Sequence, residues 1–304
     1  MYSLASFLLD KIPFRLPPHL YSYVEGVTPL STNRAVLTAL ATYLVIIFSI
    51  KAVMKNQQPL KLTGLFQLHN VILSSGSLLL LVLMLEEILP IMWKHGLHYA
   101  LCSEQAWTPR LEFYYMINYY FKYLELLDTV FLALKKKPLQ FLHVFHHSAT
   151  ALLCYTQLNG KTSIPNSRLK STQSWSVIVL NLAVHVVMYY YYYATAGGAK
   201  FWWKKYLTTM QITQFVIDLF VCYFGTYERV AFKYYPNLPH LGNCAGSGKA
   251  AAFGCALLTS YLGLFINFYF QTYKKPGSTK KSAANGVANG HANGKANGKA
   301  NGTT

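Results

Sequence analysis

The sequence predicts an all-α polytopic membrane protein with seven transmembrane helices, and three observations lead to this fold class. Hydrophobic residues make up 53% of the 304 residues, whereas charged residues make up only 12%. Seven long apolar stretches follow one another, and the chain has room for seven spans of about 20 residues each. Lysines concentrate in alternate short loops between these stretches, a pattern typical of membrane proteins with basic cytosolic loops.

The charge balance excludes two other classes of protein. The 27 Lys and Arg against 10 Asp and Glu give a formal net charge of +17. A nucleic-acid binder with this excess would carry far more charged residues in total. We therefore expect a lipid membrane, and no nucleic acid, as partner. The 15% content of aromatic residues excludes disorder for most of the chain, because disordered segments are poor in them.

The seven predicted helices differ in how purely apolar they are. In chain order they cover residues 35–54, 65–92, 111–134, 139–158, 174–196, 207–227 and 250–273. The first, second and seventh are apolar enough and long enough to span a bilayer. The third to sixth also carry polar residues, and this mixture predicts helices that face one another around an interior site.

The loops predict the orientation of the chain. Those after the first, third and fifth helices hold three lysines each, namely Lys51, Lys55 and Lys61, then Lys135, Lys136 and Lys137, then Lys200, Lys204 and Lys205. The positive-inside rule places these loops and the C-terminus in the cytosol. We therefore expect a lumenal N-terminal segment (1–34), a seven-helix membrane domain (35–273) and a cytosolic tail (274–304). Five repeats ending in Ala-Asn-Gly predict that the tail is disordered.

The third predicted helix carries charge in the middle of an apolar stretch. Lys122, Glu125, Asp128 and Thr129 are spaced three and four residues apart, which places them on one face. A charged group inside a membrane costs several kcal/mol unless it is paired or hydrated, so such groups are usually functional. An internal Lys–carboxylate network that only holds the bundle together is the alternative interpretation.

The next three predicted helices add side chains suited to catalysis. His143, His146 and His147 form a His-x-x-His-His box at the start of the fourth helix, so their imidazoles can converge. The fifth helix contributes Asn181 and His185. The sixth helix contributes Gln211, Gln214 and Asp218, and such buried polar residues also serve as contacts between helices. In the predicted topology most of these groups lie in the cytosolic half of the bundle, together with His69 and Asn70 of the second helix.

Four motifs in this order resemble the very-long-chain fatty acid elongases, and the stretches 149–158 and 201–205 resemble the fungal members most. The motifs are Lys122-x-x-Glu125-x-x-Asp128-Thr129, His143-x-x-His146-His147, Asn181-x-x-x-His185-x-x-Met188-Tyr189-x-Tyr191-Tyr192 and Thr208-x-x-Gln211-x-x-Gln214. The resemblance covers roughly residues 30 to 275. About nine residues, 165–173, depart from the fungal pattern, either as a lumenal insertion or as an error in the gene model.

The resemblance implies a reaction, a location and partners. A long-chain acyl-CoA would condense with malonyl-CoA to give a 3-oxoacyl-CoA two carbons longer, CO2 and CoA. The fold implied is a seven-helix bundle that encloses an acyl tunnel, in the membrane of the endoplasmic reticulum. Ketoacyl reductase, dehydratase and enoyl reductase are the implied partners, no cofactor or metal is expected, and a homodimer is left open.

The expected mechanism centres on His146. Neutral imidazole is nucleophilic, and we expect His146 to accept the acyl group before the malonyl-derived enolate takes it. His143, His147 and His185 would orient this nucleophile and stabilise oxyanions. Glu125 or Asp128 would fix a histidine tautomer, and Lys122, Asn181, Gln211 and Gln214 would bind or orient the substrates. The weaker version is direct condensation, with a histidine acting only as a base.

Two other functions share some of these features. Di-iron membrane desaturases and hydroxylases also carry His-x-x-His-His, but they need about eight histidines, and only five of the ten here fall within predicted helices. A seven-helix receptor or transporter explains the topology but leaves the histidine box beside acids unexplained.

The five cysteines follow no metal-binding spacing. Cys102 and Cys244 fall in the predicted lumenal loops, where disulfides form. We expect them either to pair, which would tie the loop after the second helix to the loop before the seventh, or to remain free thiols. Cys154, Cys222 and Cys255 lie within predicted spans and are expected to be packing residues.

Overall fold

Every regular element that the structure describes is a helix. The computed structural model describes residues 3–11, 17, 21–159 and 174–274. Its seven long helices are α3 (Asn33–Val53), α4 (Thr63–His95), α6 (Pro109–Leu134), α7 (Phe141–Asn159), α8 (Ser174–Ala196), α9 (Lys204–Tyr234) and α10 (Gly248–Tyr269). The shorter ones are α1 (Leu4–Lys11), α5 (Leu97–Cys102), the 3-10 turns η1 (Met54–Asn56) and η2 (Glu104–Ala106), and the π-helical turn η3 (Phe270–Lys274). The predicted tail and the segment 165–173 lie outside the described residues.

All seven predicted helices are present, and one predicted boundary is wrong. α9 continues to Tyr234, well beyond the predicted end at residue 227. Its last turns are held by polar contacts, because the Glu228 carboxylate accepts a hydrogen bond from the Leu241 amide at 2.7 Å and lies 3.7 Å from the His98 ring. These turns carry Glu228, Arg229 and Lys233, so the apolar pattern did not predict this extension.

Five of the long helices in the described part are long and apolar enough to cross a membrane, namely α3, α4, α8, α9 and α10. α6 and α7 are more polar, because α6 carries Lys122, Glu125 and Asp128 and α7 carries the three histidines. The chain is therefore a polytopic membrane protein.

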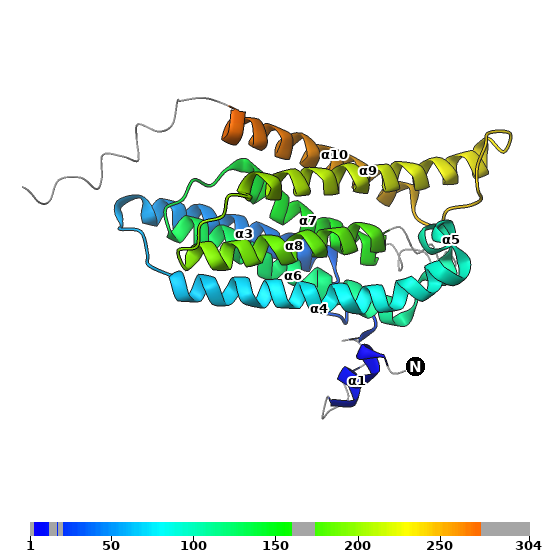
Figure 1. Cartoon of the computed structure of the whole chain (residues 1–304), viewed down its shortest axis with the longest axis horizontal. Coiled ribbons are helices and arrows are strands. Elements are labelled where there is room, and N and C mark those ends of the chain that lie inside the picture. Colours follow the sequence, from blue (N-terminus) through cyan, green and yellow to red (C-terminus); the bar gives the residue numbers. More distant parts are fainter. Residues whose placement is uncertain (1–2, 12–16, 18–20, 160–173, 275–304) are drawn as a thin grey trace, which may run out of the picture.

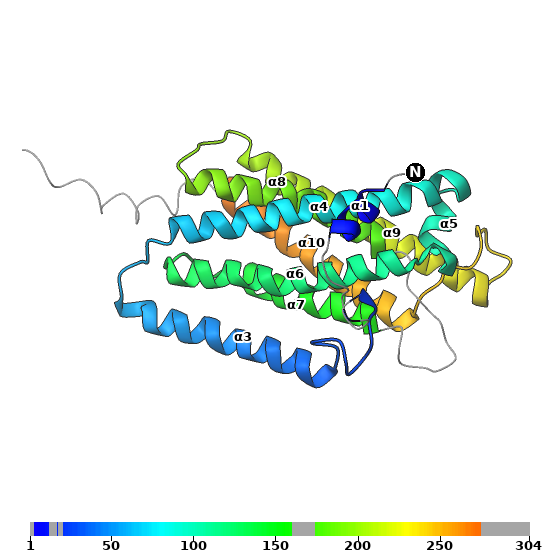
Figure 2. The ribbon, with the colours of Figure 1, turned by 90° about the horizontal axis from the view of Figure 1, so that it is seen from below.

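The long helices run side by side along one axis, and α6 and α7 lie among the others (Figures 1 and 2). The most extensive helix pairs are α4 with α8, α9 with α10 and α6 with α7. α6 buries side chains on nearly every turn, from Leu111 to Ala133. This central position explains how α6 can carry charged residues, since neighbouring helices shield them from lipid.

Two threonines fix where helices α3 and α6 begin. The Thr32 hydroxyl accepts a hydrogen bond from the Ala35 amide at 3.3 Å, and the Thr108 hydroxyl accepts one from the Leu111 amide at 3.1 Å. Pro109 follows Thr108 as the first residue of α6, where the missing N–H costs nothing. These caps set the register of α6 and therefore the face on which its charged residues lie.

The two ends of the bundle differ in chemistry. The loops 54–62, 135–140 and 197–203 meet at one end, on the left in Figure 1, and we call this the lysine end. At the opposite end, which we call the disulfide end, α5 lies near the loop before α10 (Figure 2). There Cys102 and Cys244 form a disulfide, and the Ala245 amide donates to the Cys102 carbonyl at 2.9 Å. Of the two alternatives for this pair, the structure contains the disulfide, and Cys154, Cys222 and Cys255 are free thiols.

Candidate active site

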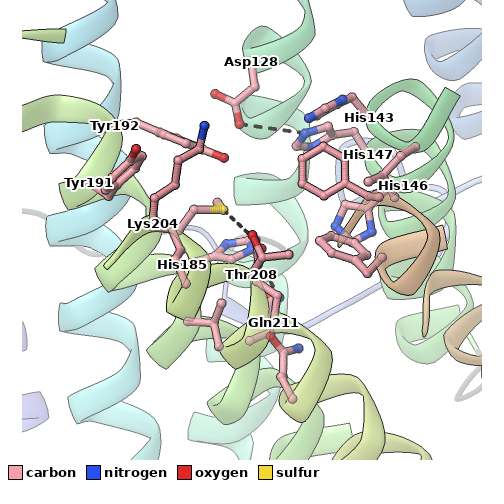
Figure 3. A pocket seen from close by; sticks show the side chains of 18 of the residues that line it. Asp128, His143, His146, His147, His185, Tyr191, Tyr192, Lys204, Thr208 and Gln211 are labelled. Carbon is pink, nitrogen blue, oxygen red and sulfur yellow. Dashed lines mark hydrogen bonds and ion pairs between the residues drawn. The ribbon is translucent and has the colours of Figure 1, made fainter. Parts of the chain in front are cut away.

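Polar residues of α6, α7, α8 and α9 line one cavity of about 300 Å³ (Figure 3). Its lining includes Lys204 and Tyr273, so it lies toward the lysine end. We call it the main cavity. Eight of the ten predicted site residues lie in its wall, namely Asp128, His143, His146, His147, Asn181, His185, Gln211 and Gln214. The other two, Lys122 and Glu125, contact Asn181 and His185 from behind the wall.

Lys122 and Glu125 form an ion pair in the interior of the bundle. Their side chains are only 2% and 3% exposed, and the Lys122 Nζ atom donates to Glu125 Oε1 at 2.8 Å and to Asn181 Oδ1 at 2.9 Å. Glu125 Oε1 also lies 3.2 Å from His185 Nδ1, and the Asn181 amide nitrogen lies 3.2 Å from His185 Nε2. This network favours the His185 tautomer with its proton on Nδ1, which leaves Nε2 to accept from Asn181. A ring nitrogen engaged in this way is a poor nucleophile.

Asp128 joins helices that are far apart in the sequence. One carboxylate oxygen lies 2.9 Å from His69 Nε2 of α4, and the other accepts a hydrogen bond from the Tyr189 hydroxyl of α8 at 2.8 Å. The second oxygen also lies 3.9 Å from His147 Nε2. Asp128 is therefore held in place by two neighbours and faces the histidine box, as Figure 3 shows.

His146 has a different environment from His147 and His185. Its ring packs against aromatic rings, with centroid distances of 4.7 Å to Tyr261, 5.8 Å to Phe265 and 6.2 Å to Phe215. Its Nδ1 atom is buried without a hydrogen-bond partner among the described residues. The aromatic neighbours fix the position of the ring while leaving it free of the carboxylates that contact His147 and His185. The Nδ1 atoms of His143 and His147 are likewise buried without a hydrogen-bond partner among the described residues, and His143 has one ring contact, with Phe268 at 6.4 Å. His146 is thus the histidine of the box that aromatic rings position most firmly away from carboxylates.

The glutamines of α9 close the opposite wall. The Gln211 amide donates to the Met188 sulfur at 3.3 Å, and the Gln214 amide donates to Asp218 Oδ2 at 3.0 Å. Thr208 also lines the main cavity, one turn before Gln211. The fourth predicted motif therefore lies across the cavity from the histidine box.

The lysine end of the main cavity is basic and aromatic. Lys204, Tyr191, Tyr192 and Tyr273 line it there. Nearby, the Lys135 ammonium lies 3.8 Å from the centroid of the Phe66 ring, which also lines the cavity. A cation on an aromatic face is held without losing its charge, so this end offers positive charge to a ligand that enters from the loops.

The sequence did not predict the contacts that three residues make at the site. His69 was noted only together with Asn70 at the start of a helix, and nothing in the sequence paired His69 with Asp128. Tyr189 belongs to the third motif, but nothing in the sequence paired it with Asp128 either. Tyr261 of α10, the nearest ring to His146, lies in an apolar helix and carried no signal at all. Contacts between helices depend on how each helix is rotated, which periodicity alone does not give.

No group of three or more His, Cys, Asp or Glu side chains in the described part of the chain is arranged to hold a metal ion. The site is instead a set of imidazole, carboxylate, amide and hydroxyl groups around an apolar cavity. Such a set can bind an oily chain, move protons and stabilise oxyanions.

Comparison with known proteins identifies the family of the chain. Residues 28–281 match the model of the GNS1/SUR4 family. The chain is 50% identical over 263 residues to "Putative fatty acid elongase 1" of Schizosaccharomyces pombe, covering 86% of this chain and 76% of that protein. It is 35% identical over 263 residues to "Fatty acid elongase A" of Dictyostelium discoideum, covering 86% of this chain and 91% of that protein.

Fold and site together define a helical polytopic membrane protein whose histidine-lined cavity lies inside the bundle. The family match and the similarity to the Schizosaccharomyces pombe protein make the assignment specific. The chain belongs to the GNS1/SUR4 family of fatty acid elongases and is of the fungal type.

Proposed function

We propose that this protein condenses a long-chain acyl-CoA with malonyl-CoA to give a 3-oxoacyl-CoA two carbons longer, CO2 and CoA. The observation that carries the proposal is His146, which faces the main cavity free of carboxylates while His147 and His185 each lie beside one. The relatives named fatty acid elongase support the reaction class. They also favour it over a di-iron desaturase or hydroxylase and over a receptor or transporter.

The proposal includes a location. All seven long helices cross the membrane of the endoplasmic reticulum, with α6 and α7 shielded from lipid by the five more apolar helices. The lysine end faces the cytosol and the disulfide end faces the lumen, in accord with the basic loops and with the oxidised pair Cys102–Cys244. Cytosolic acyl-CoA then reaches the main cavity from the side of Lys204.

The reaction proceeds in two half-reactions. In the first, a ring nitrogen of His146 attacks the thioester carbonyl, the C–S bond breaks, and CoA leaves with the imidazole proton as a thiol. In the second, the C–C bond to the malonyl carboxylate breaks, and its electron pair forms an enolate as CO2 leaves. The enolate carbon attacks the acyl-imidazole, the C–N bond breaks, and a proton restores His146. Splitting the reaction in this way replaces one difficult step by two easier ones.

The remaining site residues position His146 and the substrates. Asp128 orients His147, which can donate a hydrogen bond to a developing oxyanion. Glu125 and Asn181 engage both nitrogens of His185, so this ring supports the wall of the cavity beside His146. Gln211 and Gln214 bind polar parts of the substrates from the α9 side. The buried Lys122 neutralises Glu125, and through Asn181 it also supports the wall.

The basic rim provides for the anionic part of the substrates. CoA carries several phosphate charges, and exposed lysines of the three loops surround the lysine end. Among them Lys204 reaches the cavity wall itself. Positive charge at the mouth of a cavity raises the local concentration of anionic substrates. Three further enzymes, a ketoacyl reductase, a dehydratase and an enoyl reductase, would consume the product in turn.

Incorporation of labelled malonyl-CoA into lipid tests the function. Membranes that contain the wild-type protein should incorporate label when acyl-CoA is added, and membranes with an equal amount of His146→Ala should not. Equal incorporation by the two would refute the assignment. Direct condensation, with a histidine as base only, is distinguished by the absence of a covalent acyl intermediate.

A further inference from the structure

Two smaller cavities continue the main cavity toward the disulfide end. The inner cavity, of about 40 Å³, shares the wall residues His146, Asn181, Gln214 and Phe215 with the main cavity. A third cavity, of about 10 Å³, shares Asn118, Cys154, Gln157 and Ile178 with the inner one. The wall positions on α7 advance from the histidine box to Gln157 and Leu158 along this series. The three cavities therefore lie at successive depths along the path that a chain attached to His146 would follow.

The inner cavity is not uniformly apolar. Asp218 of α9 and Asn118 of α6 both line it, and they are 0% and 2% exposed to solvent. The Oδ1 atom of each is buried without a hydrogen-bond partner among the described residues. The other polar atom of each side chain is engaged, because Asp218 Oδ2 accepts from Gln214 and the Asn118 amide donates to the Cys154 sulfur at 3.7 Å. Two residues that each have an unpaired hydrogen-bond acceptor thus line one cavity from two helices.

These acceptors are unlike contacts that merely hold helices together. Buried polar groups in native proteins nearly always have partners, and one without a partner calls for a specific explanation. A fully apolar chain in the inner cavity would leave both acceptors unsatisfied, and that is costly. A hydroxyl group at that depth would donate a hydrogen bond to one of them. A site with buried polar groups discriminates strongly against analogues that lack the matching group.

We propose that the inner cavity is a subsite for a hydroxyl group on the acyl chain, with Asp218 and Asn118 as its acceptors. This inference rests on the proposed function and specifies its substrate class, namely long-chain acyl-CoA hydroxylated at one position well beyond the thioester. A hydroxyl nearer the thioester would lie in the main cavity, and one nearer the end of the chain would lie beyond Asp218 and Asn118. The preference for a hydroxylated substrate therefore depends on the position of the hydroxyl along the chain.

A hydroxyl scan tests the subsite. Purified protein is given pairs of acyl-CoA substrates of equal length, one unsubstituted and one hydroxylated, and the hydroxyl is moved along the chain. Competition gives the ratio of the two kcat/KM values at each position. We expect a peak of about fivefold to tenfold at one position or two adjacent ones, as one additional hydrogen bond would give. Asp218→Leu should flatten the peak and still elongate the unsubstituted chain.

Two further variants make the test independent of any one substitution. Asn118→Leu removes the second acceptor from a different helix and should lower the same peak. Ile178→Leu changes an apolar residue of the same wall at constant volume and should leave the peak in place. A wild-type scan without a peak would overturn the inference, as would a peak that persists in both acceptor variants. If the wild type elongates no acyl-CoA at all, the proposed function fails, whereas elongation of unsubstituted chains without a peak overturns the subsite alone.

Discussion

The side chains of His69 and Asp128 meet at 2.9 Å although 59 residues separate them in the chain. This contact joins α4 to α6 directly beside the histidine box, since the other oxygen of Asp128 lies 3.9 Å from His147. The Asp128 carboxylate therefore connects α4, which carries none of the four motifs, to the His147 ring that this carboxylate orients.

Asp128→Asn keeps the size of the side chain but removes its charge. We expect kcat for condensation to fall by about 10- to 100-fold, because hydrogen bonds to charged groups contribute about 1.5–3 kcal/mol. KM should change little, since Asp128 orients His147 and does not hold the substrate. Glu104→Gln, an exposed acid in η2, is the matched control and should keep full activity. Unchanged kcat in Asp128→Asn would show that Asp128 has only a structural role.

Lys122→Met leaves the Glu125 carboxylate buried without its cation. We expect it to destabilise the protein by about 3–5 kcal/mol, the usual cost of removing one partner of a buried ion pair. Replacing both partners, as in Lys122→Met with Glu125→Gln, should recover part of that loss, because no unpaired charge remains. Thermal unfolding of the detergent-solubilised proteins measures both effects. A single variant as stable as the double variant would contradict the ion-pair account.

The disulfide between Cys102 and Cys244 holds α5 to the segment before α10. A protease site introduced into the loop after α9, between residues 235 and 240, would cut the chain into two fragments that this bond still joins. We expect them to migrate together without reductant and apart with it. Cys102→Ser should separate them under both conditions, and Cys222→Ser, which changes a free thiol, should behave as the wild type does. Separation of the wild-type fragments without reductant would show that the bond is not formed in the protein.

A covalent acyl-enzyme is the prediction that distinguishes the two versions of the mechanism. Incubation with acyl-CoA alone should add the mass of one acyl group, less one proton, to the intact protein. The adduct should map to His146 and be absent from His146→Ala. His95→Ala, at an exposed histidine beyond the cavity, should still form it. If malonyl-CoA is consumed normally while no adduct forms, the histidine acts as a base only.

Much of the site was predictable from the sequence because it follows from helix geometry. The spacing of Lys122, Glu125 and Asp128 placed these residues on one face of a helix, and the His-x-x-His-His box predicted three converging imidazole rings. Eight of the ten predicted site residues line the main cavity. The placement of Lys122 and Glu125 behind the wall was not predictable, since it depends on how far α6 is rotated toward α8. The contact of Tyr261 with His146 was not predictable either, because an aromatic residue in an apolar helix looks like packing. The same holds for the two smaller cavities, because the wall of the inner one combines residues of five helices.

The central claim is that His146 catalyses a decarboxylating condensation, and product analysis with purified protein tests it most directly. With acyl-CoA and malonyl-CoA as the only substrates, the wild type should release one CO2 and one CoA for each 3-oxoacyl-CoA formed, two carbons longer than the substrate. His146→Ala, present at the same folded amount, should form none above background. Release of CO2 without acyl-CoA, or equal product from the two proteins, would contradict the account.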